Sequence, residues 1–341
     1  MLHNEPLHIS VLLVIRNEER YIASLIENLL NQKRKGFTFD LIIVDGESTD
    51  KTLDIVNEYV AIGHAIKVVT NPKKTLPTGW NIGIKEASGA YILRVDGHTS
   101  VPNDFLQQYV DCIKQQPDAD VVGGIIQSRG VGRQGKVNEY VYSHPFGVGN
   151  SKFRTLEGKA WKGYVDTVPY GAYKRSVFSD VGLFDERLKR NEDIEFHKRM
   201  RDLGKTFYLS TTIQSTYYVR PTLKGLIDKS LGDGKWNMIA NAATPGALGL
   251  RHRIPLLAFL TGLVLLIASL FSTAMLLLFS GIVLVYVALN ATVSYQCAKE
   301  NGLTSWLPCI GTFFILHFVR GFASFQAYFS RHYWHIKRTH Q

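Results

Sequence analysis

The sequence predicts an α/β fold, a mainly parallel sheet flanked by helices, followed by C-terminal transmembrane helices. The first observation is an alternation of short, β-branched apolar segments with amphipathic segments in the N-terminal part. The second is that each strand-like segment is almost continuously apolar, which is typical of strands covered on both faces. The third is the stretch from Ile254 to Ala298, which contains no Asp, Glu, Lys or Arg. We expect this stretch to enter a membrane.

The N-terminal elements alternate as strand and helix. His8–Ile15 predicts a buried strand, and apolar side chains recur at helical spacing from Tyr21 to Leu30. The same patterns predict further strands at Phe39–Val44, Ala65–Thr70 and Ala90–Val95, and helices through Leu53, Val56 and Val60 and over Thr78–Ala87. Asp45 and Asp96 each directly follow a predicted strand, and ligands bind outside the carboxyl ends of parallel strands. We therefore expect both carboxylates on one rim of the sheet, where the carboxyl ends of its parallel strands lie.

The pattern is mixed after Asp96. The composition predicts strands at Val121–Gln127 and Val165–Tyr173, with a mobile loop region over 130–163 between them. A largely helical stretch follows at Val177–Leu203, interrupted near Asp185. The last elements predicted before the apolar tail are a short strand at Phe207–Leu209 and an amphipathic helix at Leu223–Ile239.

Two apolar segments, Ile254–Phe271 and Ala274–Tyr295, are each long enough to cross a bilayer, at roughly 20 residues. A third, Leu303–Phe325, contains His317 and Arg320. Because a third full crossing would move the basic C-terminus to the outside, against the positive-inside tendency, this segment is predicted to be re-entrant or interfacial. Two or three crossings, and a buried core hairpin, remain the alternatives.

The net charge of +10 indicates an anionic binding partner. The sequence has no arginine-rich helix, zinc spacing or RNA-binding aromatic pattern, so nucleic acid is not an expected partner. Basic residues flank the apolar segments instead, at Arg251, Arg253, Arg331, Lys337 and Arg338. This placement favours membrane lipid with anionic head groups.

Three scattered cysteines give no disulfide framework or metal spacing, and the N-terminus lacks the features of a signal peptide. Both observations predict a cytosolic location for the soluble part.

Two acidic turns follow the predicted strands. Asp96-Gly97-His98 could hold a divalent metal against a diphosphate, or could be an ordinary turn. The turn from Asp45 to Asp50 could accept hydrogen bonds from a nucleoside, or could cap the next helix. Among the nearby cations Lys73, Lys74, Lys85 and Arg94, we interpret Lys85 as surface and the others as candidates to attract a diphosphate.

Asn191-Glu192-Asp193 opens a predicted helix, and capping accounts for one of these two acids. The second acid, with His197, Lys198, Arg199 and Arg201 following, suits a base that faces a phosphate-rich site.

Together these segments resemble a family 2 glycosyltransferase with a GT-A fold, from about Ile9 to Trp236 and into the apolar tail. The matching motifs, each short, are Val14–Glu18, Val44–Asp50, Asn81–Gly83, Asp96–His98, Gly182–Glu186 and Glu192-Asp193. The subgroup most similar is that of the succinoglycan-type exopolysaccharide glycosyltransferases. The chain departs from the family in having Asp45-Gly46 for Asp-Asp, Asp96-Gly97-His98 for Asp-x-Asp, and Gly232–Trp236 where others have Gln-x-x-Arg-Trp.

The resemblance implies a role for each candidate residue. Glu18, Asp45 and Asp50 would contact uridine, and Lys74, Asn81 and Asp96 would complete the nucleotide site. Asp96 and His98 would bind Mn²⁺ or Mg²⁺, Asp193 would be the general base, and Glu192 would help to set the acceptor geometry.

The predicted function is an inverting transfer from a UDP-sugar to a hydroxyl of a lipid-linked glycan, in exopolysaccharide, capsule or related cell-surface glycan synthesis. The alternatives are transfer to polyprenyl phosphate itself, and a catalytically inactive membrane scaffold. The expected location is the inner (plasma) membrane, multi-pass, with a cytoplasmic catalytic domain. The predicted ranges are 1–220 for the GT-A catalytic domain, 221–253 for an interfacial helix and linker, 254–330 for the transmembrane region and 331–341 for a basic tail.

Overall fold

A computed structural model describes residues 6–339. The chain divides into two compact units. One is built from the chain up to Gln127 together with Leu156–Tyr218, and the other from Ser128–Thr155 together with the chain from Val219 onward.

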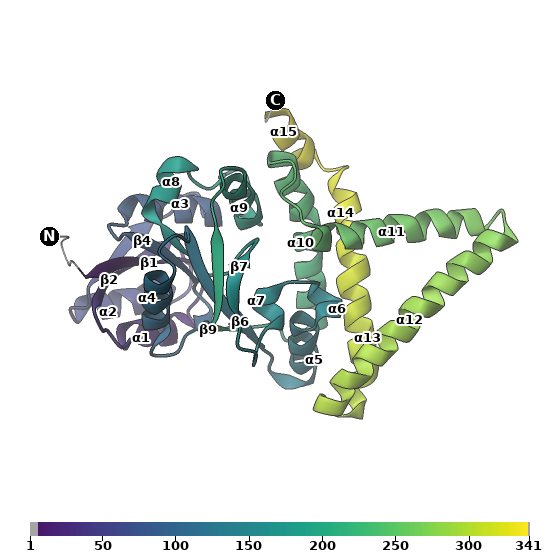
Figure 1. Cartoon of the computed structure of the whole chain (residues 1–341), viewed down its shortest axis with the longest axis horizontal. Coiled ribbons are helices and arrows are strands. Elements are labelled where there is room, and N and C mark those ends of the chain that lie inside the picture. The colour runs from purple at the N-terminus through teal and green to yellow at the C-terminus, as the bar shows by residue number, and fades with distance from the viewer. Residues whose placement is uncertain (1–5, 340–341) are drawn as a thin grey trace. The chain divides into compact units, whose positions relative to one another are not determined.

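The first unit contains one mixed sheet with helices on both faces (Figure 1). Its elements in chain order are β1 (Leu7–Ile15), α1 (Ile22–Leu30), β2 (Phe37–Asp45), α2 (Thr52–Ala61), β3 (Ile66–Thr70), α3 (Leu76–Glu86), β4 (Tyr91–Asp96), β5 (Thr99–Ser100), α4 (Phe105–Gln115), β6 (Val121–Arg129), β7 (Lys162–Val165), β8 (Ala172–Lys174), α8 (Arg175–Asp180), α9 (Glu192–Asp202) and β9 (Phe207–Tyr218).

The strand order is β3-β2-β1-β4-β8-β6-β9-β5, with β7 paired to β9. The first four strands in that order are parallel. β8 is antiparallel to both β4 and β6, and β9 is antiparallel to β5 and β7. The α/β fold class is therefore confirmed.

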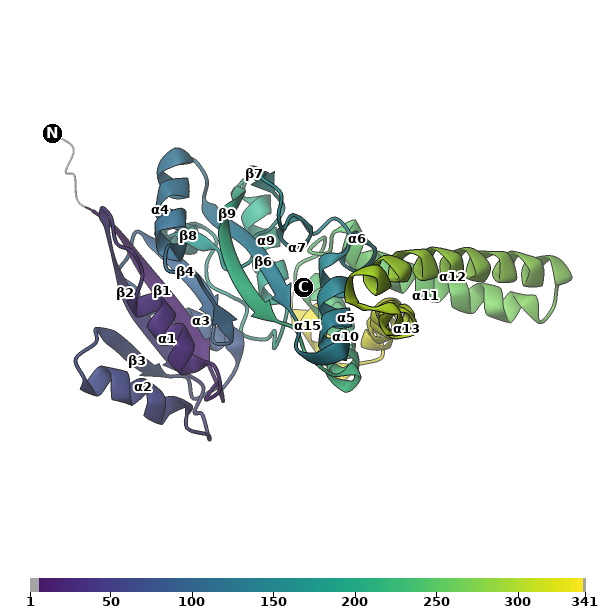
Figure 2. The same cartoon turned by 90° about the horizontal axis from the view of Figure 1, so that it is seen from below.

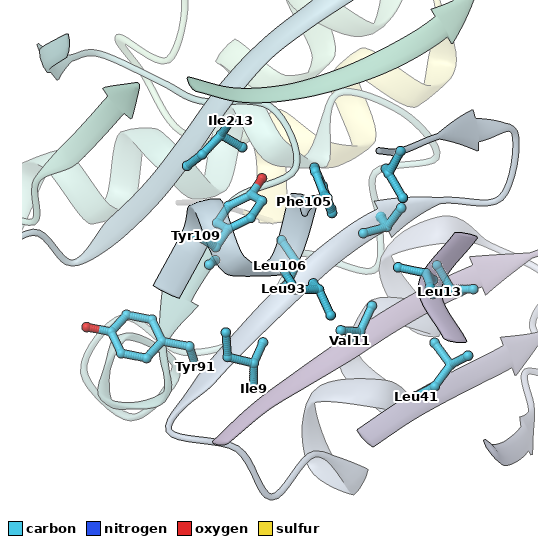
Figure 3. Close-up of a cluster of buried hydrophobic side chains, with 14 of the residues drawn as sticks. Ile9, Val11, Leu13, Leu41, Tyr91, Leu93, Phe105, Leu106, Tyr109 and Ile213 are labelled. Carbon is cyan, nitrogen blue, oxygen red and sulfur yellow. The ribbon is translucent and has the colours of Figure 1, made fainter. Parts of the chain in front are cut away.

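The two faces of β1 pack against different helices. Ile9, Val11 and Leu13 belong to a buried apolar cluster with residues of α1 and α4 (Figure 3). Leu12, on the opposite face, meets α3, where a Cβ on Gly83 would lie 2.0 Å from the Leu12 Cδ1 atom. Glycine is thus required at this position for α3 to approach the strand that carries the candidate site.

All the strands and helices predicted before residue 97 are present, with small shifts at their ends. One detail is wrong, since Val60 was predicted on the apolar face of α2 and is 38% exposed. The helix at the start of the apolar tail and its partner are also present, as α11 (Leu250–Ser269) and α12 (Thr273–Asn301).

Several predictions after residue 129 are wrong. The region 130–163 is not a loop but contains α5 (Gly132–Ser143), α6 (Pro145–Val148) and α7 (Lys152–Thr155). The strand predicted at Val165–Tyr173 is present only at its two ends, because Pro169 cannot donate to a ladder and Tyr170 has φ 43. β9 continues well beyond Leu209, whereas the predicted interruption near Asp185 is present, from the end of α8 to the start of α9.

The second unit is helical. Besides α5, α6, α7, α11 and α12 it contains α10 (Leu223–Ala243), η1 (Leu303–Ser305), α13 (Trp306–Phe314), η2 (Ile315–Val319), α14 (Arg320–Ala327) and α15 (Arg331–Thr339). Figure 2 shows α11 and α12 as a hairpin joined by a tight turn. Close helix contacts involve glycine again, since a Cβ on Gly321 would lie 2.3 Å from the Pro255 carbonyl oxygen and one on Gly234 would lie 2.4 Å from that of Arg320.

Three helical segments are long and apolar enough to cross a membrane: Leu250–Ser269, Thr273–Asn301 and Leu303–Ala327. Their mean hydropathies are 1.7, 2.2 and 1.4, and the first two are mostly exposed, with 11% and 6% of their most apolar window buried. Such exposure of apolar side chains needs a lipid environment. The three candidate spans therefore suggest a membrane-associated protein.

Candidate active site

The carboxyl ends of the parallel strands bring two predicted acids to one rim. In the sheet register, Asp45 of β2 pairs with Ile15 of β1, and Asp96 of β4 pairs with Val14 of β1. The two acids thus lie on the strands that flank β1, about 10 Å apart at the usual strand spacing. The expectation that they share a rim is confirmed.

The loops after β1 and β2 are tied together by hydrogen bonds. The backbone N–H of Asn17 donates to Ser48 Oγ (3.0 Å), and the N–H of Thr49 donates to Asn17 Oδ1 (2.8 Å). The N–H of Glu18 donates to Thr52 Oγ1 (2.7 Å). Because these bonds join backbone to side chain across two loops, the rim has a fixed shape without any ligand.

Asp45 and Asp50 both take part in this local structure. Asp45, 3% exposed, accepts bonds from the backbone N–H and the hydroxyl of Ser48. Asp50 accepts from the N–H and the hydroxyl of Thr52, and from the N–H of Glu19. Asp50 satisfies a backbone donor in the first turn of α2, whereas the bonds of Asp45 order the loop, and α2 has no side-chain cap bond at its N-cap Lys51. A carboxylate oxygen can still accept a further bond from a ligand.

Left-handed backbone is concentrated at the same loops. Asn17, Glu47 and Lys74, which follow β1, β2 and β3, have φ of 57°, 52° and 58°. Asn191, immediately before α9, has φ 58°. Such conformations are unfavourable for residues other than glycine and persist where surrounding contacts impose them, commonly at binding sites.

The turn Asp96-Gly97-His98 lies against the loop after β1. His98 Nδ1 is 3.1 Å from Glu18 Oε1, and both side chains are partly exposed. A Cβ on Gly97 would lie 2.9 Å from Ile15 Cγ2 and 3.1 Å from Glu18 Cγ. Glycine is therefore what allows the turn and Glu18 to come together.

These residues fit a divalent metal that is completed by substrate. Within residues 6–339 no three His, Cys, Asp or Glu side chains form a ready metal site. Asp96 and His98, with Glu18 adjoining, offer a hard oxygen and an imidazole nitrogen at the mouth of the rim. Mg²⁺ and similar ions are commonly held by one or two carboxylates plus substrate phosphates, so this partial set is chemically sufficient.

The other residues predicted to hold the nucleotide are paired with protein groups. Lys73 Nζ is 2.8 Å from Glu186 Oε2, and Lys74 Nζ is 2.6 Å from Glu47 Oε2. Asn81 is buried, and its amide bonds to the backbone N–H and C=O of Phe184 and to Glu186. The described contacts of Asn81 hold the segment 184–186. Lys85 is exposed, as the sequence indicated.

Glu192 forms a buried ion pair at the start of α9. Its Oε1 accepts from Arg94 Nη2 at 3.1 Å, and the side chain is 4% exposed. Burial, opposed by Arg94 and reinforced by the negative charges of Asp193 and Asp96, raises the pKa of Glu192 to about 7. The Arg94 guanidinium lies 4.2 Å from the centre of the Trp80 ring. The ion pair thus joins the end of β4, which carries Asp96, to the start of α9, which carries Asp193.

Asp193 is half-buried, unlike its neighbour Glu192. One of its oxygens, Oδ1, accepts from the N–H of Ile194 at 2.8 Å. The N-terminus of α9 favours the anion at this position. Asp193 is therefore a carboxylate that is held in place, partly open to solvent and close to the Arg94–Glu192 pair.

The basic residues that follow on α9 have partners within the protein. Arg199 bonds to Glu195 and to backbone carbonyls, Lys198 pairs with Asp202, and Arg201 donates to the carbonyl of Asp166. His197 is 1% exposed and points into the core. These side chains fix α9 within the first unit.

Three features around Arg94 and Glu192 are not indicated by the sequence. They are the pairing of these two residues, the hydroxyl of Tyr173 and the ring of Trp80. The available signal was weak. Arg94 is a charged residue in the middle of an otherwise apolar strand, where burial requires a partner.

Comparisons with known proteins agree on one family. The family model of Glycosyl transferase family 2 matches residues 10–182. The chain is 31% identical over 233 residues to dolichyl N-acetyl-alpha-D-glucosaminyl phosphate 3-beta-D-2,3-diacetamido-2,3-dideoxy-beta-D-glucuronosyltransferase of Methanococcus voltae, covering 66% of this chain and 71% of that one. It is 28% identical over 246 residues to succinoglycan biosynthesis protein ExoA of Rhizobium meliloti (strain 1021), covering 70% and 72%.

Among solved structures, the mannosyltransferase PcManGT from Pyrobaculum calidifontis, in complex with GDP-Man and Mn²⁺, is similar with a TM-score of 0.60. The match covers 95% of this chain and 87% of that chain at 14% identity. At this identity the likeness concerns the fold.

Proposed function

Because the chain belongs to glycosyl transferase family 2, we propose that it moves a sugar from a UDP-sugar to a hydroxyl of a lipid-linked glycan, with inversion at the anomeric carbon. The names of two relatives support this class of acceptor. One acts on a dolichyl N-acetylglucosaminyl phosphate and the other belongs to succinoglycan biosynthesis.

The observation that carries the proposal is the ion pair between Arg94, two residues before Asp96 on β4, and Glu192, next to Asp193 on α9. Asp96 ends a parallel strand, where a ligand would meet the sheet, and Asp193 begins a helix beside it. A group that binds the leaving diphosphate and a group that takes a proton must both reach one sugar. These acids are placed suitably for the two tasks.

The loops after β1 and β2, at the rim of the sheet, would bind the nucleoside. Glu18, Asp45 and Asp50 would accept hydrogen bonds from the uridine, and Lys74 would attract the diphosphate by exchanging its contact with Glu47. Asn81 would act indirectly, through the segment 184–186 that it holds.

Asp96 and His98 would hold a divalent ion, Mn²⁺ or Mg²⁺, with Glu18 supporting His98. When bound, the ion would neutralise charge on the departing diphosphate, so that no protein acid need protonate it. The protein's own side chains would supply the remaining chemistry, which is deprotonation and orientation of the acceptor hydroxyl.

Asp193 is the proposed general base. As the acceptor oxygen forms its bond to the anomeric carbon, Asp193 takes the hydroxyl proton and the bond from carbon to the UDP oxygen breaks, with its electron pair leaving on UDP. The attack comes from the side opposite to the leaving group, as in inverting glycoside hydrolysis. Glu192, paired with Arg94, would orient the acceptor beside Asp193.

The candidate spans would anchor this site at the inner (plasma) membrane as a multi-pass protein, with the first unit on the cytoplasmic side. A membrane anchor keeps the catalytic unit close to an acceptor that cannot leave the bilayer. The basic residues at Arg251 and Arg253, next to the first span, agree with this orientation.

The decisive test is Asp193→Asn, assayed with a panel of nucleotide sugars and extracted lipid acceptors. We expect sugar transfer to fall by about 10³-fold or more, because the amide cannot take the proton, while UDP affinity changes little. Asp202→Asn on the same helix, whose carboxylate pairs only locally with Lys198, serves as the matched control and should retain activity. Full transfer by the Asp193→Asn protein would remove the assigned base.

A further inference from the structure

A buried polar chain runs behind the ion pair of Arg94 and Glu192. His197 Nε2 is 2.6 Å from the hydroxyl oxygen of Tyr173, and His197 Nδ1 is 2.7 Å from Thr167 Oγ1. Tyr173 of β8 pairs with Ile92 of β4, so its side chain lies on the same face of the sheet as that of Arg94 and diagonally next to it. His197 and Tyr173 are each 1% exposed. Hydrogen bonds thus join Thr167, His197 and Tyr173, and Tyr173 adjoins the ion pair of Arg94 and Glu192.

The neighbouring charge favours one direction for these bonds. The positive charge of Arg94 favours the lone pairs of the Tyr173 oxygen on its side, so the hydroxyl hydrogen goes to His197 Nε2. Nε2 must then carry no proton, and the remaining imidazole proton sits on Nδ1 and is donated to Thr167. The arrangement requires a neutral imidazole. Burial, together with the positive charges of Arg94 and Arg201, holds the pKa of His197 well below its usual range.

Two aromatic rings hold the Arg94 guanidinium on its other sides. Its central carbon lies 4.2 Å from the centre of the Trp80 ring and 5.0 Å from that of Phe184. With the Glu192 carboxylate this makes three contacts, and little freedom remains for the head group.

We propose that His197 and Tyr173 are positioning residues, which act through Arg94 to hold Glu192, and with it Asp193, in the geometry that transfer requires. This rests on the proposed function, since Asp193 is the base assigned there. A displacement of about 1 Å at a reacting group can reduce rate by about 10²-fold, so a buried chain of this kind has a measurable kinetic effect.

The test is Tyr173→Phe in the full-length protein, which removes one hydroxyl and leaves the ring in place. We expect kcat to fall by about 10-fold or more with the KM for the UDP-sugar within about 2-fold, because the donor site is untouched. His197→Phe added to Tyr173→Phe should cost little more, since both act on the same arginine.

Tyr109→Phe is the matched control. Tyr109 is also 1% exposed, and its hydroxyl donates to the carbonyl of Tyr170 outside the chain described above. It should lose a comparable amount of thermal stability and keep its kcat. Unchanged kcat in Tyr173→Phe, or an equal loss in both variants, would assign the network to stability alone.

An activity-independent measurement separates this inference from the proposed function. Absence of transfer by the wild-type protein with every sugar would overturn the function. Thermal unfolding of Tyr173→Phe, Glu192→Gln and the double variant would then still test the network. Strongly non-additive shifts in Tm support it, and additive shifts overturn it.

Discussion

At the scale of single residues, two adjacent acids occupy different environments. Glu192 is buried against Arg94, whereas Asp193 is half-buried and bonded to the N–H of Ile194. The difference follows from the start of α9, where consecutive side chains point about 100° apart. One carboxylate is therefore buried in the core while its neighbour stays partly open to solvent.

The raised pKa of Glu192 predicts the pH dependence of turnover. If the ion pair with Arg94 must form, kcat should rise as pH increases through about 7, where Glu192 loses its proton. Glu192→Gln should lower kcat and abolish this acidic limb. Glu58→Gln, on the exposed side of α2, should leave the profile unchanged. An identical limb in Glu192→Gln would assign it to another group.

Stability should change in the opposite sense over the same range. The folded-state pKa of Glu192, about 7, lies above the ordinary value of 4.5, so the folded protein binds this proton more tightly than the unfolded chain does. The stabilising contribution is complete below about 4.5 and is lost as pH rises through about 7. Thermal unfolding of the wild type against Glu192→Gln measures the difference.

The sequence contained enough information to locate the candidate acids but not the contacts between them. Asp45 and Asp96 could be placed because each follows an apolar strand, and parallel strands end at one edge. The contact of Arg94 with Glu192 joins β4 to α9, and that of His98 with Glu18 joins two loops. Neither spacing nor composition encodes such pairings, because they depend on how distant elements pack.

At the scale of elements, glycine determines how closely the turn after β4 approaches β1. Gly97→Ala would bring a Cβ within 2.9 Å of Ile15 and 3.1 Å of Glu18. We expect Glu18 and His98 to separate, and Mn²⁺-dependent UDP binding to weaken by about 10-fold or more. Isothermal titration with and without Mn²⁺ measures this.

Gly158→Ala is the control, because nothing lies within 4 Å of the Cβ it would introduce. It should bind UDP as the wild type does, allowing for the strain of φ +74 there. Equal affinities in both variants would contradict the role given to the turn.

The elements that could be predicted are those whose burial is carried by large apolar side chains. α1 buries Ile22, Leu25, Ile26 and Leu29 at regular helical spacing. α5 was missed because its buried face includes Gly135 and Asn138 among only a few larger apolar residues. The full length of β9 is not evident from the sequence, because the strand is mostly polar from Ser210 onward and nevertheless pairs with β5.

At the scale of the whole molecule, charge is divided between the two units. The second unit has sixteen Lys and Arg against four Asp and Glu, and the first has twenty-three against twenty-five. The positive net charge of the protein thus belongs to the unit that contains the candidate spans. Anionic head groups would bind that unit and leave the first unit available for a nucleotide.

The membrane assignment can be tested in α12. Leu284 is 72% exposed near the middle of the helix, and Leu284→Arg should disfavour insertion by about 3 kcal/mol at a bilayer centre. Extraction with alkaline carbonate should release more of this variant than of the wild type. Ile62→Arg is matched in exposure, at 73%, but lies in the first unit and should not change extraction. Equal release of all three proteins would mean that α12 does not insert.

The four left-handed residues around the rim have a practical meaning for engineering. Asn17, Glu47, Lys74 and Asn191 each adopt a conformation that glycine accepts at lower cost. Glycine replacements there would relieve backbone strain, but at Asn17 glycine would also remove the side-chain oxygen that accepts from the N–H of Thr49. They would also loosen the shape that the ligand must match, so heat tolerance gained in this way should be accompanied by slower catalysis.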